Sequence, residues 1–298
     1  MNGHRTLKVA AVLIAMAPML AKADGARDWL NAPIDMNFLY AYYTYSNSET
    51  SINSNLPVDG AEVSAHVPIL RYARTFDMGG RVGGIQFVVP YAFIDAELAG
   101  TKLSRSINGA SDITAIFLGN IHGAPALAPQ EFAAWTPESY LTAAISVTAP
   151  TGSYHSDRLI NPGKNRWAFK PQLAWGKPTR PGEWLSINGA VEFYGKNDSY
   201  FRERTQKQDE LFVVDMHYSK NLSQAAWVAI DAIYSHGGEV RIDGAHQDNE
   251  QKTLRLGVSG SMNFSPTDAI SAGVTRTAIK ESHTPSATNL QISYSKIW

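Results

Sequence analysis

Apolar and polar residues alternate with a period of two along most of the chain. Between Leu185 and Phe193 the odd positions carry Leu, Ile, Gly, Val and Phe, whereas the even positions carry Ser, Asn, Ala and Glu. The stretches 212–218 and 254–264 repeat this alternation. A period of two produces a strand with one apolar and one polar face, whereas an amphipathic helix needs apolar residues three and four positions apart. The pattern therefore predicts an all-β fold.

About twelve such segments follow one another, near the spacing expected for membrane-spanning strands of about ten residues. The links between them alternate between short, turn-rich stretches and longer polar ones, as in a transmembrane antiparallel up-and-down β-barrel with short periplasmic turns and long external loops. The predicted strands are approximately 36–46, 61–75, 82–98, 110–121, 139–149, 166–176, 184–196, 210–220, 225–236, 252–264, 268–280 and 288–298.

One link departs from that alternation. The stretch 122–137 should be periplasmic, yet it is long and rich in Ala and Pro. We expect it to form a short helix or to lie across the base of the barrel.

Aromatic residues gather near the predicted strand ends, as the two interfacial girdles of a membrane barrel require. The alternative, a soluble β-sandwich or barrel, would concentrate them in the middle of the strands. The predicted periplasmic band is Trp135, Trp175, Trp184, Trp227 and Trp298, and the loop-side band is Tyr42, Tyr43, Tyr45, Trp167, Tyr194 and Tyr234.

The first residues have the layout of a secretory signal peptide. Two basic residues precede the apolar run 9–17, and Ala21 and Ala23 supply small residues at positions −3 and −1 of a cleavage site. The run is too short for a transmembrane helix, and no later segment approaches the length that a spanning helix needs. We therefore expect a signal peptide at 1–23 and one exported barrel domain at 24–298, because only a closed barrel could then place this chain in a membrane.

Composition narrows the function classes. The chain has 298 residues, of which 44% are hydrophobic, 10% aromatic and 18% charged, with a formal net charge of −1. This balance excludes a basic protein that binds nucleic acid. Because the chain has no Cys, disulfides, thiol catalysis and Cys-based zinc sites are excluded as well. No cofactor is expected.

The last strand carries a recognisable local signal. Leu290, Ile292, Tyr294 and Trp298 lie an even number of positions apart and end the chain on an aromatic residue. This pattern resembles the carboxy-terminal insertion signal of outer-membrane proteins of Gram-negative bacteria, and Lys296 departs from it. We predict that these four residues form a membrane-insertion signal, which makes the outer-membrane assembly machinery and the lipid bilayer the expected partners.

The stretch from Val147 to Tyr154, VTAPTGSY, is followed by LINPGKNRW from Leu159 to Trp167 and by FKPQ from Phe169. These motifs resemble the central region of the family named for the MetA-pathway of phenol degradation, and the resemblance extends from about residue 30 to the end of the chain. It implies a barrel in the cell outer membrane that transports small hydrophobic or aromatic compounds inward. The family's functional residues are poorly defined, so none are carried over.

Polar residues of the alternating strands should face the barrel lumen if the apolar faces contact lipid. They form either an ionic network that seals a narrow barrel or a path for a small solute, and both interpretations remain open. On adjacent strands we expect Glu192 near Asp215 and Asp231 near Arg255. The candidate lumen residues are Arg166, Lys170, Gln172, Glu192, Asp215, His217, Asp231 and Arg255. At the external rim, Tyr43, Tyr45 and Tyr154 are expected to contact a passing aromatic ring.

Two further clusters contain the residue types of a catalytic site and of a metal site. Ser153, His155 and Asp157 have the residue types of a hydrolase triad, but at this spacing their side chains lie side by side without the required relay. An outer-membrane lipid hydrolase is therefore the alternative to a channel, followed by a structural barrel without transport, and no enzyme is expected. A second cluster matches no known metal motif and is expected to be a solvated loop: His236, Asp243, His246, Asp248 and Glu250.

Overall fold

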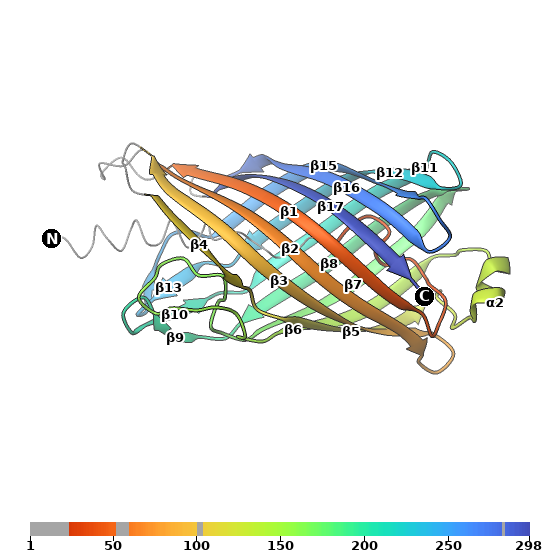
Figure 1. Ribbon diagram of the computed structural model, residues 1–298, viewed down its shortest axis with the longest axis horizontal. Coiled ribbons are helices and arrows are strands. Elements are labelled where there is room, and N and C mark those ends of the chain that lie inside the picture. The colour runs from red at the N-terminus through yellow and green to blue at the C-terminus, as the bar shows by residue number, and fades with distance from the viewer. Residues whose placement is uncertain (1–23, 52–59, 100–103, 282–283) are drawn as a thin grey trace.

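The computed structural model describes residues 24–51, 60–99, 104–281 and 284–298, so the expected signal peptide at 1–23 lies outside the described residues. Twelve antiparallel strands close into a barrel (Figure 1), which confirms the predicted fold class and strand number. These strands are β1 (Asn37–Ser51), β2 (Gly60–Asp77), β3 (Val82–Ala99), β5 (Thr114–His122), β6 (Tyr140–Thr148), β7 (Ala168–Arg180), β8 (Glu183–Tyr194), β11 (Leu211–Asn221), β12 (Ala226–Gly237), β15 (Gln251–Asn263), β16 (Asp268–Lys280) and β17 (Ser286–Ile297).

The first and last strands close the barrel. β1 pairs with β17 along twelve registered positions, from Phe38 opposite Ile297 to Glu49 opposite Ser286. Short strand β4 (Ser104–Ala110) continues the line of β5 beyond a break at 111–113 and pairs only with β3. No helix in the described part of the chain is long and apolar enough to cross a membrane.

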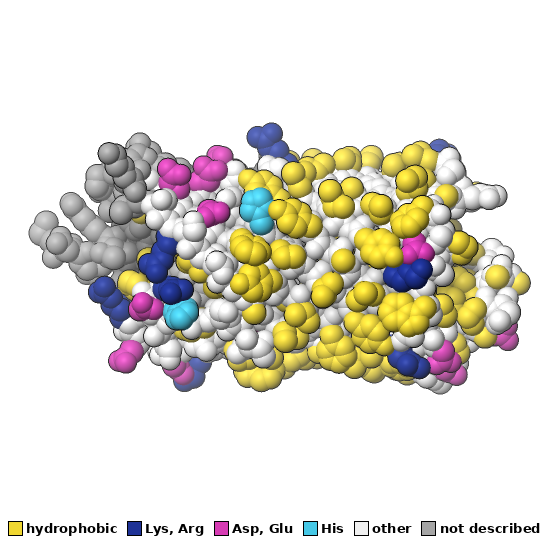
Figure 2. Space-filling model, in the orientation of Figure 1, with side chains coloured by type: hydrophobic (Ala, Val, Ile, Leu, Met, Phe, Trp, Pro, Cys, Tyr) yellow, Lys and Arg dark blue, Asp and Glu magenta, His cyan; other side chains and the backbone are white. Residues whose placement is uncertain are grey.

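Alternation along each strand separates an apolar outer face from a polar inner face. On β3, for example, Ile85 and Phe87 are 36% and 42% exposed, while Gln86 between them is buried. Figure 2 shows hydrophobic side chains over the middle of the barrel and charged side chains toward its two ends. This distribution suits a sheet whose outer face contacts lipid acyl chains and whose ends contact water.

The last strand follows the same rule. Leu290, Ile292, Tyr294 and Trp298 are 40–59% exposed and lie on the outer face. The exception, Lys296, places its ammonium group 2.8 Å from Oδ2 of Asp268 on the neighbouring strand, so its charge is paired.

The expected aromatic girdles are wrong for four residues. Trp184 and Trp227 lie on inner faces, where the Trp184 ring is 6.1 Å from the ring of buried Tyr140 and the Trp227 ring lies under the guanidinium of Arg27 at 5.2 Å. Tyr42 and Tyr194 also face the lumen, since both line a cavity inside the barrel. Position along a strand sets the depth of a residue, but only its parity decides whether it faces lipid or lumen.

The external loops form a cap with secondary structure of its own. A four-stranded sheet combines β9 (Asn197–Tyr200), β10 (Arg204–Gln208), β13 (Val240–Ile242) and β14 (Ala245–His246), where the sequence predicted only polar loops. Leu159 packs against the apolar cluster of this sheet and also against a larger cluster on β2, β3 and β4. The loop 149–167 therefore joins the cap to the barrel wall.

Asp112, in the break between β4 and β5, holds that loop in place. Its two carboxylate oxygens accept the backbone N–H groups of Gly152 at 2.8 Å and Lys164 at 2.7 Å. Gly152 lies so close to Gly163 that a Cβ atom on Gly152 would be 2.7 Å from the Gly163 Cα. The motif that resembles the family is thus a folded loop held by one buried carboxylate.

At the opposite end, residues 24–36 lie inside the barrel and cross its lumen. Arg27 donates to Ser219 Oγ at 2.8 Å on one side, and the backbone N–H of Asp35 donates to Thr75 O at 3.1 Å on the other. We call this segment the plug. The link 122–137 contains the short helix α2 (Pro129–Ala134), as expected, and its Leu127 O accepts a hydrogen bond from the plug.

Replacing Trp298 with Ala is expected to lower the yield of folded, heat-modifiable barrel several-fold. Trp298 exchanges two backbone hydrogen bonds with Asn37 across the seam between first and last strands, and its exposed ring lies where interfacial aromatics anchor a strand. Gel mobility with and without heating measures the folded fraction, and Trp135→Ala serves as the aromatic control. Normal folded yield for Trp298→Ala would contradict the insertion role.

Replacing Asp112 with Ala is expected to release the loop 149–167 without unfolding the barrel. The change removes two hydrogen bonds to a buried carboxylate, each contributing about 1.5–3 kcal/mol. Limited proteolysis should cut the loop faster, and single-channel conductance should rise as the cap loosens. Asp157→Ala, an exposed residue of the same loop, should leave both measurements unchanged.

Candidate functional site

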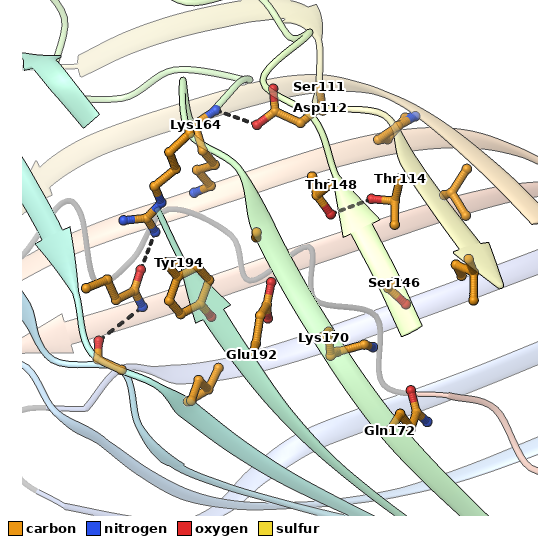
Figure 3. Close-up of a pocket in the computed structure, with 18 of the residues that line it drawn as sticks. Ser111, Asp112, Thr114, Ser146, Thr148, Lys164, Lys170, Gln172, Glu192 and Tyr194 are labelled. Carbon is orange, nitrogen blue, oxygen red and sulfur yellow. Dashed lines mark hydrogen bonds between the residues drawn. The ribbon is translucent and has the colours of Figure 1, made fainter. Parts of the chain in front are cut away.

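A cavity of about 280 Å³ occupies the lumen between the plug and the external cap (Figure 3). Plug residues Asp24 and Trp29 border it from below, and Gln208 and Val240 belong to the cap sheet that borders it from above. Its walls come from β1, β2, β3, β5, β6, β7 and β8. The cavity is therefore enclosed by parts of the chain that are far apart in sequence.

Strands β7 and β8 supply one polar wall of this cavity. Lys170 and Gln172 of β7 and Glu192 and Tyr194 of β8 point into it (Figure 3). They occupy even positions, whose odd neighbours, such as Phe169 and Phe193, are exposed on the outer face. Four of the eight candidate lumen residues, Arg166 among them, thus line one cavity, and whether they form a solute path stays a prediction.

Arg166 and Lys164 form a cationic group under the cap. The Arg166 guanidinium lies 4.7 Å from the centre of the Tyr194 ring, and its Nη2 donates to Gln208 Oε1. Its Nη1 is buried without a hydrogen-bond partner among the described residues. Lys164 lines the same cavity. Its side chain as a whole is exposed, but desolvation of the ammonium inside the lumen and the nearby Arg166 charge lower the pKa of Lys164 to about 8.

Sequence reasoning missed Lys164 as a site residue, although it lies within the family-like motif. In an extended strand it would share its face with Arg166, two positions later. The spacing of two residues between Lys164 and Arg166 was therefore the sequence signal that could have identified Lys164.

The other four candidates do not line this cavity. Asp215, His217 and Asp231 are 3–5% exposed, and Nδ1 of His217 lies 2.6 Å from Oδ1 of Asp231. Arg255 is half-buried on β15 and forms no ion pair among the described residues. These four belong to the wall beside and below the cavity.

One of the two expected pairings between adjacent strands is wrong. Glu192 is in register with Leu211, and Asp215 is opposite Asn188, so four residues separate the two acidic side chains along the strands. Arg255 is two positions from Gly257, the register partner of Asp231, but Asp231 hydrogen-bonds His217. Alternation gives the face of each residue, whereas the stagger between strands depends on how the barrel closes.

Plug residues, which no sequence pattern indicated, complete the floor. Asp24 accepts hydrogen bonds from Gln172 Nε2 and from the Trp29 indole, and its backbone N–H lies 3.2 Å from Asp215 Oδ2. Because residues 24–36 show neither alternation nor a helical period, their burial could only be seen in the folded barrel.

An aromatic ladder extends along the inner face of β1. The rings of Phe38 and Tyr40 stack at 6.4 Å and those of Tyr40 and Tyr42 at 5.8 Å. Tyr42 borders the cavity, whereas Phe38 lies near the end of β17, opposite Ile297. The ladder therefore connects the cavity with the short-turn end of the barrel.

The expected rim aromatics face different surroundings. Tyr43 is half-exposed on the outer face and its hydroxyl lies 2.7 Å from Nδ1 of His66. Tyr154 accepts a hydrogen bond from Asn197 within the cap, and its contact with a passing ring stays a prediction. The inner parity of Phe38, Tyr40 and Tyr42 was a signal that sequence reasoning overlooked.

The described residues contain no assembled hydrolase triad at 153–157. Ser153 packs against Gly109, His155 and Asp157 are exposed, and no side-chain hydrogen bond joins the three. Ser186, His217 and Asp231 also form a row of these residue types across β8, β11 and β12, but His217 Nε2 has no hydrogen-bond partner among the described residues. This row lacks the bond between nucleophile and base that a triad needs.

The loop cluster at 236–250 forms separate ion pairs. His236 Nε2 lies 3.6 Å from Glu250 and His246 Nδ1 lies 2.7 Å from Glu239. Across the described residues, no three His, Cys, Asp or Glu side chains gather as metal ligands.

Several solved structures share this fold. The COG4313 outer membrane channel from Pseudomonas putida F1 is 22% identical, with 93% of this chain and 100% of that chain covered at a TM-score of 0.78. The beta domain of the Bordetella autotransporter BrkA is 10% identical, with 89% and 100% covered at a TM-score of 0.56. The corresponding search among curated proteins found no match.

The family comparison agrees with the motif at 147–172. A family model described as the MetA-pathway of phenol degradation matches residues 44–293, which spans every barrel strand from β1 to β17. The chain therefore belongs to the family of the MetA-pathway of phenol degradation.

Proposed function

We propose that this protein is an outer-membrane channel through which small hydrophobic, chiefly aromatic, solutes reach the periplasm. The observation that carries the proposal is a cavity inside a closed barrel that continues into a ladder of stacked rings. The family name refers to phenol degradation, and the Pseudomonas putida F1 protein with this fold is described as an outer membrane channel. Both support a channel, and we propose no catalytic activity.

The cavity has the size and lining for one small ring. An apolar cavity of about 150 Å³ holds benzene, so the volume of about 280 Å³ accommodates a substituted ring. Tyr42, Ile69, Val88 and Ile116 supply apolar surface, and the polar groups of β7 and β8 orient a ring substituent. This combination of apolar lining and a few polar groups is typical of small-molecule sites.

The ladder gives such a solute a continuous aromatic surface beyond the cavity. Each ring-to-ring contact contributes about 0.5–1.5 kcal/mol, which favours binding without trapping the solute at one position. The plug occupies the rest of the lumen at this level, so we propose that the solute moves along β1, between the plug and Phe38, Tyr40 and Tyr42.

Export follows from the same proposal. We propose that residues 1–23 are a signal peptide and that cleavage leaves 24–298 as the barrel domain. The assembly machinery would then recognise the last strand, and the belt of exposed hydrophobic side chains would contact the lipid bilayer.

Uptake of labelled phenol or toluene at limiting concentration tests the function. Cells with the gene should take up the solute faster than cells without it, and liposomes that contain the pure barrel should admit it faster than protein-free liposomes. Tyr40→Leu should slow uptake about two- to tenfold, because it keeps apolar volume but removes two ring stacks. Tyr234→Leu on the outer face is the matched control. Equal uptake with and without the gene, together with equal entry into liposomes with and without the barrel, would favour a structural barrel.

The charge of Lys164 should make ion selectivity depend on pH. Below its pKa of about 8 the Lys164 ammonium is charged. Together with Arg166 it then offsets the negative charge of the nearby carboxylates Asp112 and Glu192. As the pH rises from 7 to 9 this positive charge is lost, so the channel should become more cation-selective.

Reversal potentials in a KCl gradient measure this change. The Lys164→Gln variant should already be cation-selective at pH 7, and its reversal potential should change little between pH 7 and pH 9. Lys196→Gln is the control, because this exposed lysine pairs with Asp198 at 2.9 Å outside the lumen. An unchanged pH step in Lys164→Gln would show that another group titrates.

A further inference from the structure

The cationic group under the cap has hydrogen-bond donors that nothing in the fold uses. Arg166 is only 8% exposed, and although Nη2 donates to Gln208, Nη1 has no partner among the described residues. Leaving a donor of a buried charged group unpaired is costly. A buried guanidinium with an open donor next to a cavity is therefore arranged for an acceptor from outside the chain.

Lys164 places a second cation beside the same space. Its backbone N–H is bound by Asp112, but its ammonium forms no hydrogen bond or contact ion pair with any described residue. Both side chains line the cavity, and each disfavours the charge of the other. An anion between them would relieve this repulsion and accept hydrogen bonds from both.

The neighbouring carboxylates do not fill this role. Both oxygens of Asp112 already accept backbone N–H groups. Glu192 lies on β8 beside Tyr194 (Figure 3) and makes no contact ion pair with Arg166 or Lys164. The cations Lys170 and Arg71 line the lower part of the cavity together with the acidic groups Glu192 and Asp24, so the cap side is where two cations lie without a contact ion pair.

Below the two cations, apolar and aromatic side chains face the polar wall of β7 and β8. Tyr42, Ile69, Val88 and Ile116 line it from the barrel wall, and Trp29 lines it from the plug. A ligand that satisfies both regions has an anionic head toward the cap and an apolar body toward the plug.

We propose that this cavity binds an amphipathic carboxylate, such as an aromatic acid, with its carboxylate beside the Arg166 guanidinium and Lys164 Nζ and its ring among the apolar residues below. This inference rests on the proposed channel function and specifies the chemical class of its solute. Neutral hydrocarbons would use the apolar part of the same cavity with weaker binding.

Binding of two isosteric probes to the purified, folded protein tests the inference. Phenylacetate should bind at least about tenfold more tightly than 2-phenylethanol, which has a similar shape but no charge. Lys164→Gln and Arg166→Gln should each weaken phenylacetate binding about tenfold and change 2-phenylethanol binding less than twofold. Lys164→Gln keeps the backbone bond to Asp112, and heat-modifiable mobility verifies that both variants fold. Lys196→Gln is the matched surface control.

The outcomes separate this inference from the function on which it rests. Equal affinity for the two probes, or phenylacetate binding that neither variant changes, overturns the inference. Acetate binding as tightly as phenylacetate also overturns it, because the ring would then contribute nothing. If the barrel raises the entry rate of toluene but not of phenylacetate above that into protein-free liposomes, the channel function stands and the carboxylate inference fails. If it raises the entry rate of neither solute, both proposals fail.

Discussion

The structure depends on one constraint: every backbone N–H and C=O group at membrane depth needs a partner within the protein. Pairing β1 with β17 removes the two free edges that an open sheet would leave. Closure also divides each strand into an outer and an inner face, which is why side chains such as Phe87 and Gln86 meet different surroundings although they are neighbours in sequence. The apolar belt and the polar lumen are both consequences of that closed ring.

The barrel lumen is filled from its two ends by different parts of the chain, the external loop with the cap sheet at one end and the plug at the other. At the loop end, one buried carboxylate fixes a long loop, and apolar clusters join that loop to the wall and to the cap sheet. At the other end, the plug is held by side-chain and backbone hydrogen bonds to opposite walls. The cavity is the space between the cap and the plug. Its cationic roof comes from the external loop, whereas its apolar lining comes from the barrel wall and from Trp29 of the plug. The strands thus supply the walls of the candidate site, and the two ends of the barrel supply its roof and floor.

The alternation of apolar and polar residues was sufficient to predict the strands, because a strand with one lipid-facing side has an apolar residue at every second position. It also placed Lys170, Gln172 and Glu192 correctly in the lumen. It could not place Glu192 relative to Asp215, because the stagger between strands is a property of the closed sheet. It could not show that Trp184 and Trp227 face inward either, since tryptophan suits lipid interfaces and lumen alike. The plug has no periodic pattern, and the parity that Lys164 shares with Arg166 could not show that Asp112 holds its backbone beside the cavity.

The adjacency of the first and last strands has a consequence for assembly. The seam between β1 and β17 can form only after the whole chain has been delivered, and the plug is directly continuous with β1. The plug can therefore be laid against β11 while the sheet is still open on one side, and joining the seam then encloses it. No chain end has to be threaded through a finished ring. The contents of the lumen are thus determined by the order in which the strands are joined.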